Sequence, residues 1–253
     1  MRNQPKNSAL IGALWHATSE VPQDIDLPLS AANGQRLQRE LCQRWLDRGK
    51  PVGGWKVGMT SGGSRDAMGP GVRPFGYVLR ERILPSGSDV AIDLIQIGGV
   101  ENELCFRFAA TPPRDCDANS IRDYLDGVAP GFEVNQKRLS GTPSDGVRVA
   151  DNLSNWGIVH GSFQALDTLP DNLDDLTVAL SRDGEELATV GSRGHIDDHF
   201  ETLALLARSV PRYQLDIEPG HVAITGAYAR TPLAPGRYRG DFGSLGSVEV
   251  ILT

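Results

Sequence analysis

Three glutamates and one lysine are the side chains of this 253-residue chain whose types and spacing suggest chemistry. Glu101 and Glu103 stand two residues apart in segment 100–109, where polar and apolar side chains alternate. On a β-strand such residues point to one side, with Cα atoms about 6.5 to 7 Å apart. A divalent cation can neutralise the pair, and a third carboxylate from a neighbouring strand would complete an oxygen site suited to Mg²⁺ or Mn²⁺. Glu133, at the start of an expected strand over 132–139, is the candidate third ligand.

Lys56 lies in an apolar, glycine-rich segment, 51–60, whose alternation predicts another strand. A partly desolvated lysine has its pKa lowered toward the range useful for proton transfer, although nearby carboxylates raise it again. The same pattern also fits an edge-strand lysine that reaches out to water. The glutamate pair likewise fits an ordinary solvated strand face, so spacing alone leaves both alternatives open.

Other chemical motifs are absent from the sequence. Ser154 lacks a GxSxG setting, which favours a hydrogen-bonding role over a nucleophilic one. The five histidines show no metal-type spacing such as HExxH, and surface or capping roles are expected for them. The glycine-rich segments match neither GxGxxG nor GxxxxGK[ST], so nucleotide binding is not indicated.

The surrounding elements are mostly strands. Segment 30–49 predicts an amphipathic helix with Leu37, Leu41 and Trp45 on one face, and segment 198–210 predicts another helix that ends before Pro211. Further strands are expected over 75–79, 90–97, 176–184, 222–226 and 247–253. Without regular βα alternation, the pattern favours an α+β protein with a mixed β-sheet folded on itself and an N-terminal helical segment. We expect one catalytic domain, 1–253, with helices in 1–50 and the mixed β core in 51–253.

The composition limits the classes of binding partner that are expected. The chain has 32 acidic and 25 basic residues, a net charge of -7 and a pI near 5.2, and its basic residues are scattered. Nucleic acid is therefore not an expected partner, whereas a small molecule is. Three cysteines without a CxxC pair indicate reduced thiols. No apolar run approaches the roughly 18 residues of a membrane span, and a cytoplasmic protein is expected.

Seven short motifs occur in a characteristic order along nearly the whole chain, and they resemble the fumarylacetoacetate hydrolase superfamily. The similarity is to its branch of 2-keto-4-pentenoate hydratases and 4-oxalocrotonate decarboxylases. The matching segments are GWKVGMTS (54–61), VENE (100–103), GFEV (131–134), VADNLS (149–154), Gly194-His195, ITG (224–226) and GSLGSV (243–248).

The resemblance implies a divalent-metal lyase with a contorted mixed β-sheet, a homo-oligomer that acts on 2-oxo or 2-hydroxydienoic acids from aromatic-compound degradation, with room for a pathway partner enzyme. The implied metal ligands are Glu101, Glu103 and Glu133; Lys56 matches the acid/base lysine and Ser154 the active-site serine; Thr60, Ser61 and Thr225 fall in the substrate-binding motifs. A 2-oxo acid can chelate one cation through its carboxylate and keto oxygens, and the cation then stabilises the enolate.

One departure from the branch concerns the loop after the lysine strand. Hydratases commonly carry Pro-Asp-aromatic-Gly there, whereas this chain has Arg73-Pro74-Phe75-Gly76, with Pro74 in place of the Asp. Decarboxylases of the branch also lack that acid/base carboxylate. Arg73 is either a contact for a second substrate carboxylate or a loop cation. The Ala227–Arg230 stretch also replaces an expected glycine-rich continuation, so substrate specificity could be unusual.

The main functional prediction is hydration of a 2-hydroxypenta-2,4-dienoate-like substrate to a 4-hydroxy-2-oxo acid. The alternative is decarboxylation of a 4-oxalocrotonate-like 2-oxo diacid. An acylpyruvate-type C–C hydrolase is a further alternative, for which His16 and Glu20 are a poor stand-in for the usual His-Glu pair. Loss of the loop Asp also leaves a non-catalytic family member open.

Overall fold

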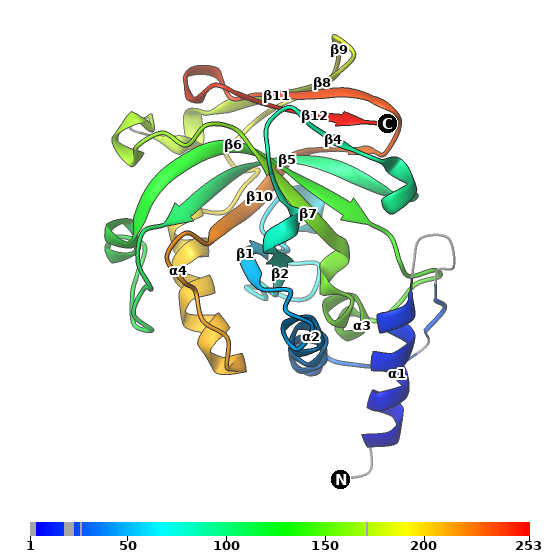
Figure 1. Ribbon diagram of the computed structural model, residues 1–253. Helices are drawn as coiled ribbons and strands as arrows, with labels where there is room; N and C mark the ends of the chain where they lie inside the picture. Colours follow the sequence, from blue (N-terminus) through cyan, green and yellow to red (C-terminus); the bar gives the residue numbers. More distant parts are fainter. Residues whose placement is uncertain (1–3, 18–22, 26, 171) are drawn as a thin grey trace.

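The computed structural model describes residues 4–17, 23–25, 27–170 and 172–253, and it is built from two mixed β-sheets with helices beside the larger one (Figure 1). The seven-stranded sheet has the order β2 (Phe75–Leu79), β1 (Val52–Val57), β10 (Val222–Pro232), β5 (Gly98–Phe108), β6 (Leu125–Gln136), β7 (Asn155–His160) and β3 (Ile83–Pro85). The five-stranded sheet has the order β4 (Ser88–Val90), β12 (Ser247–Leu252), β11 (Gly236–Asp241), β8 (Thr177–Arg182) and β9 (Glu185–Gly191). The α+β class with mixed sheets is confirmed, and both sheets are open.

The α-helices of the described chain are α1 (Gln4–His16), α2 (Ala31–Leu46), α3 (Asp145–Ala150) and α4 (His199–Ser209). They lie on the side of the larger sheet that faces away from the smaller one (Figure 1). Ser30 caps α2 by accepting a hydrogen bond from the backbone N–H of Asn33, and Asp198 caps α4 in the same way through Glu201. Both predicted helices are therefore confirmed, each beginning one residue after its cap.

One face of strand β5 packs into the hydrophobic core, and the other face carries the candidate site residues. Leu104, Phe106 and Phe108 are fully buried, and Phe106 packs edge-on against Phe200 of α4 with ring centroids 5.7 Å apart. Burying each such side chain stabilises the fold by about 1.5 to 3 kcal/mol. The predicted alternation over 100–109 is confirmed, and it directs Glu101 and Glu103 to the opposite face.

Two predicted strands have different bounds in the structure. The expected strand over 90–97 is a short β4 followed by a 3-10 turn, Ile92–Leu94, and the apolar Leu94 and Ile97 are exposed rather than buried. Strand β6 begins at Leu125 instead of 132, so Glu133 lies inside the strand and not at its start. Pro130 is tolerated because the β6–β7 ladder starts only at Gly131, and its carbonyl accepts a hydrogen bond from Gly161.

Helix α2 reaches the core through two buried glutamines, Gln35 and Gln38, and the Gln35 amide donates to the carbonyl of Phe75 (3.0 Å). The Gln38 amide donates to the carbonyl of Phe75 in β2 (2.8 Å) and to that of Val149 in α3 (2.9 Å). This links the N-terminal helices to the elements that carry the site. The division into a helical segment, 1–50, and a β core within one domain stays a prediction. No helix in the described ranges combines the length and apolarity needed to cross a membrane.

Candidate metal centre

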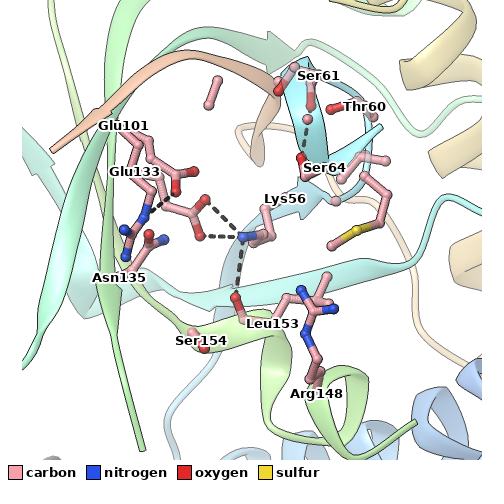
Figure 2. A pocket seen from close by; sticks show the side chains of 18 of the residues that line it. Lys56, Thr60, Ser61, Ser64, Glu101, Glu133, Asn135, Arg148, Leu153 and Ser154 are labelled. Carbon is pink, nitrogen blue, oxygen red and sulfur yellow. Dashed lines mark hydrogen bonds and ion pairs between the residues drawn. The ribbon is translucent and has the colours of Figure 1, made fainter. Parts of the chain in front are cut away.

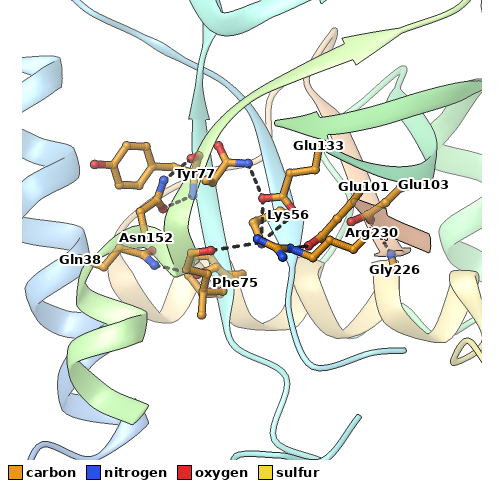
Figure 3. Close-up of polar contacts among 12 residues, drawn as sticks. Gln38, Lys56, Phe75, Tyr77, Glu101, Glu103, Glu133, Asn152, Gly226 and Arg230 are labelled. Atoms are coloured by element: carbon orange, nitrogen blue, oxygen red, sulfur yellow. Dashed lines mark hydrogen bonds and ion pairs between the residues drawn. The ribbon is translucent and has the colours of Figure 1, made fainter. Parts of the chain in front are cut away.

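Three carboxylates converge on the site side of strands β5 and β6. Glu133 stands directly opposite Glu101 in the antiparallel ladder, and Glu103 follows two residues along the same face. One oxygen from each side chain lies within 4.8 Å of the others. Glu103 and Glu133 are buried, and the Glu101 side chain is 17% exposed (Figures 2 and 3). The structure thus brings together the three predicted ligands on a face that is not solvated, which removes the alternative of an ordinary exposed strand.

Each carboxylate is oriented by a partner from another strand. The backbone N–H of Gly226 donates to Glu103 (2.6 Å), Asn155 of β7 donates to Glu133 (2.8 Å), and Arg230 pairs with Glu101 (3.0 Å) (Figure 3). The pairing of β10 with β5 shifts register between Ile224 and Ala227, which is a β-bulge that aims the Gly226 amide at the site. Such outer contacts fix ligand orientation in metal sites.

Burial and mutual repulsion of the three carboxylates favour the binding of a cation. Burial, and next the charge of Glu133, raise the pKa of Glu101 to about 7. Burial and the charges of Glu133 and Glu101 raise the pKa of Glu103 well above its ordinary value. Carboxylate oxygens are the ligands that hard divalent cations prefer, and a bound cation would offset both the repulsion and the desolvation. The residues therefore fit a divalent metal ion.

Lys56 projects from the interior of the larger sheet toward the carboxylates. Its strand β1 lies between β2 and β10, and the residue is only 8% exposed, so the edge-strand alternative is wrong. The ammonium donates to both oxygens of Glu133 (2.7 and 2.8 Å) and lies 3.4 Å from the carbonyl of Leu153. Gly76 stands opposite Lys56 in the β1–β2 ladder and makes room for the lysine side chain. A Cβ at position 76 would lie only 3.0 Å from Cγ of Lys56. Burial lowers the pKa of Lys56, but the charges of Glu133 and Glu101 raise it more, and the net pKa is above its ordinary value.

A left-handed turn, Asn152–Ser154, brings the Leu153 carbonyl to Lys56. All three residues have positive φ (57°, 53° and 61°), a conformation that costs non-glycine residues of order 1 kcal/mol or more each. The Asn152 side chain holds the turn by accepting from the Tyr77 N–H (2.9 Å) and donating to the Tyr77 carbonyl (2.8 Å). Strain maintained by buried hydrogen bonds is a feature of functional sites.

These groups open into a cavity of about 880 Å³ (Figure 2). Thr60, Ser61 and Ser154 line it, as expected from their motifs. Other polar residues of the wall come from separate loops and strands and carry no motif of their own apart from His195: Ser64, Asn135, Lys137, Arg148 and His195. Only the Gly194-His195 pair carried a signal, through the resemblance.

Two of the expected substrate contacts lie elsewhere. Arg73 does not line the cavity, and its guanidinium is held by Asp66 and Asp197 at 2.6 Å each. Thr225 is fully buried, and its hydroxyl contacts Nδ1 of His199 at 2.7 Å. Their substrate-binding roles stay predictions that this geometry does not support, because neither polar group reaches the cavity.

Pro74, two of the histidines and Glu20 also bear on the sequence expectations. Pro74 is buried, and its carbonyl accepts from the Gly58 amide (2.8 Å), so the proline has a backbone role there. His199 and His221 are buried, which corrects the expectation of surface or capping histidines. Glu20, the partner suggested for His16, lies outside the described residues.

Comparisons with known proteins agree with this picture. No family model matches the chain. It is 24% identical over 239 residues to 2-oxo-hept-4-ene-1,7-dioate hydratase from Escherichia coli, covering 89% of this chain and 88% of the relative. It is 26% identical over 220 residues to 4-oxalocrotonate decarboxylase from Pseudomonas sp. strain CF600, covering 84% and 83%.

Solved structures show the same fold. 4-Oxalocrotonate decarboxylase from Pseudomonas putida G7, complexed with magnesium and adipate, aligns with a TM-score of 0.88 at 23% identity, covering 100% of this chain and 99% of that one. Fumarylpyruvate hydrolase from Pseudomonas aeruginosa, in complex with Mn²⁺ and pyruvate, aligns with a TM-score of 0.63 at 16% identity, covering 81% and 91%. The resemblance indicated by the motifs is therefore confirmed: the chain has the fold of the fumarylacetoacetate hydrolase superfamily, and its sequence is similar to the hydratases and decarboxylases of that branch.

Proposed function

We propose that this protein is a divalent-metal-dependent lyase that hydrates a 2-hydroxypenta-2,4-dienoate-like substrate to a 4-hydroxy-2-oxo acid, with Mg²⁺ or Mn²⁺ as cofactor. The observation that carries the proposal is the convergence of three carboxylates opposite a buried lysine in one cavity. Similarity to a hydratase over most of both chains supports it. A non-catalytic role leaves unexplained why the fold would bury like charges together at a cost in stability.

Glu101, Glu103 and Glu133 would hold the cation, which supplies Lewis-acid stabilisation of negative charge on the oxygens of a 2-oxo acid. Lys56 holds a proton at Nζ beside that position and can deliver it to, or take it from, the substrate carbon chain. Ser154 lies on the cavity wall next to Leu153 and is placed to orient substrate or water. Glu103 and Glu133 are buried, which strengthens their electrostatic interactions.

Decarboxylation of a 4-oxalocrotonate-like diacid is the second candidate, and two observations favour it. Besides the three glutamates, the only carboxylate on the described cavity wall is Asp145, which is 46% exposed, so no further buried acid is available for water addition. Arg148 and Lys137 line the same cavity and could pair with a second substrate carboxylate, Arg148 in exchange for its exposed, 3.6 Å ion pair with Asp145.

One experiment separates these reactions. Metal-stripped protein, then protein reloaded with Mg²⁺ or Mn²⁺, is incubated with 2-hydroxypenta-2,4-dienoate and with 4-oxalocrotonate, while dienol absorbance is followed and products are identified by mass spectrometry. Metal-dependent gain of water establishes the hydratase, and loss of CO₂ establishes the decarboxylase. The proposal fails if neither product forms with any metal, or if the variant Lys56→Ala retains full turnover.

We also infer, from the resemblance, that the protein works in the cytoplasm as a homo-oligomer, alongside a partner enzyme of the same pathway. Sedimentation of the purified protein tests whether it forms a homo-oligomer. Co-purification with the enzyme that produces its dienoate tests the association with a partner enzyme.

A further inference from the structure

A second cavity lies behind the metal centre, between the ends of α1 and α2 and the start of β7. Its volume is about 200 Å³. The lining combines basic, amide and aromatic side chains: Trp15, Trp45, Tyr77, Arg82, Arg138 and Trp156, with Asn152, Asn155 and Gln136 nearby. It shares no lining residue with the metal cavity.

The left-handed turn separates the two cavities. Leu153 and Ser154 face the metal cavity, whereas Asn152 and Asn155, on either side of them in sequence, line the second one. The second cavity is therefore not a substrate subsite, although Asn155 also orients Glu133.

The second cavity contains more positive than negative charge. Arg138 pairs with the buried Asp151 (2.8 Å), which accounts for one guanidinium. Within the described ranges, no carboxylate forms an ion pair with Arg82. Burial and the nearby charge of Arg138 lower the pKa of Arg82. The charges of Tyr77 and Glu81 offset this only in part, and the exposed Glu81 carboxylate pairs with Lys50. A partly buried cation whose charge is incompletely balanced is costly, and a bound anion would offset that cost.

Aromatic rings surround the same guanidinium. Its central carbon lies 5.9 Å from the ring centre of Trp45 and 5.5 Å from that of Trp156. Trp15 lies against Trp45 with centroids 4.6 Å apart. Flat apolar walls favour a planar ligand body. A cavity of about 150 Å³ already accommodates benzene, so the volume here leaves space for a ring with one small substituent.

We propose that this cavity is a binding site for a small planar carboxylate, an aromatic acid or a dienoate of similar size, whose carboxylate is held by Arg82 and whose body lies among the tryptophans. Arginine suits this role because its planar fork matches two carboxylate oxygens. Three of the four tryptophans of the chain line the cavity, so binding changes intrinsic fluorescence.

The test uses benzoate and the full-length protein, with binding measured by isothermal titration calorimetry and tryptophan fluorescence. Titrations are run with EDTA and again with Mg²⁺, because a carboxylate could also bind at the metal centre. We expect saturable binding that does not require metal and persists in Glu103→Gln. Arg82→Met should weaken it at least tenfold, Arg82→Lys should weaken it less, and uncharged benzamide should bind at least tenfold more weakly.

Arg80→Met is the matched control, since Arg80 belongs to the same short 3-10 turn but is exposed and does not line the cavity. Circular dichroism confirms that each variant is folded. Absence of saturable binding overturns the proposal, as does unchanged affinity in Arg82→Met. Binding that appears only with metal and is lost in Glu103→Gln assigns benzoate to the catalytic cavity instead. Affinity that falls as protein concentration rises shows that a second copy of the chain covers the site, which also overturns it.

Discussion

The charge state of Glu101 should make the stability of the metal-free protein depend on pH. Burial, followed by the charge of Glu133, raises the pKa of Glu101 to about 7 from an ordinary 4.5. A carboxyl group with a higher pKa in the folded state contributes full stability below its unfolded pKa, and this contribution is lost as pH rises through the folded pKa. We therefore expect the metal-free protein to become less stable between pH 5 and pH 8.

The size of this loss follows from the two pKa values. Their difference corresponds to about 3 kcal/mol in the free energy of unfolding, because each pH unit is worth about 1.4 kcal/mol. Less than about 1 kcal/mol of it is lost by pH 5, since the unfolded pKa lies only just below that pH. The remaining loss between pH 5 and pH 8 is about 2 to 3 kcal/mol.

Urea unfolding in EDTA at several pH values, for the wild type and for Glu101→Gln, measures this loss. Other buried groups also titrate: the pKa of Asp151 is raised to about 6 by burial, and burial lowers the pKa of His199 to about 4. The first lowers stability with rising pH and the second increases it, and both contributions cancel in the difference between the two proteins. The contribution of Glu103 does not cancel, because the charge of Glu101 raises its pKa, so the difference measures the two coupled carboxylates together. Identical pH dependence in the two proteins would refute the reasoning. Saturating Mg²⁺ should abolish the loss, because the cation binds the ionised carboxylates.

Two further sets of variants test the site. Gly226→Ala places a Cβ 2.9 Å from Oγ1 of Thr60 and moves the amide that orients Glu103, so we expect at least tenfold weaker Mn²⁺ binding, measured by electron paramagnetic resonance. Unchanged Mn²⁺ affinity would show that this amide does not position a ligand. Arg148→Met should raise KM for 4-oxalocrotonate about tenfold and leave KM for 2-hydroxypenta-2,4-dienoate unchanged, because only the diacid offers a second carboxylate. Arg73→Met should change neither KM, since its guanidinium is engaged outside the cavity; an effect on the diacid alone would restore its predicted role.

The alternation of polar and apolar residues within a single strand was enough to predict the arrangement of two of the three glutamates. The alternation over 100–109 placed Glu101 and Glu103 on one face because side chains on a strand repeat every two residues. The position of Glu133 opposite Glu101 depends on the register between two strands, which no local pattern determines. Its residue type and its place on another expected strand made Glu133 a candidate, the resemblance supported it, and the ladder provides the physical reason for its position.

Other features depend on contacts between distant segments. From sequence, Arg73 is either a contact for a second substrate carboxylate or a loop cation, but Asp197, which lies 124 positions away, engages it. The turn at Asn152–Ser154 has no glycine to mark its left-handed backbone, and it forms because Asn152 bonds to a strand 75 residues earlier. The second cavity draws its walls from several elements, so composition alone could not indicate it.

The arrangement around Lys56 also suggests how the chain could do without the loop Asp. Lys56 shares Glu133 with the proposed cation position, so the field that keeps its proton weakens when that carboxylate is neutralised. If Lys56 is the acid of the proposed reaction, it would become a stronger acid in the loaded site. The Leu153 carbonyl at 3.4 Å, fixed by the strained turn, remains as an acceptor that keeps the ammonium in place. Proton delivery and metal occupancy would thus be coupled through one glutamate, and a separate carboxylate at the Pro74 position is not required for that step.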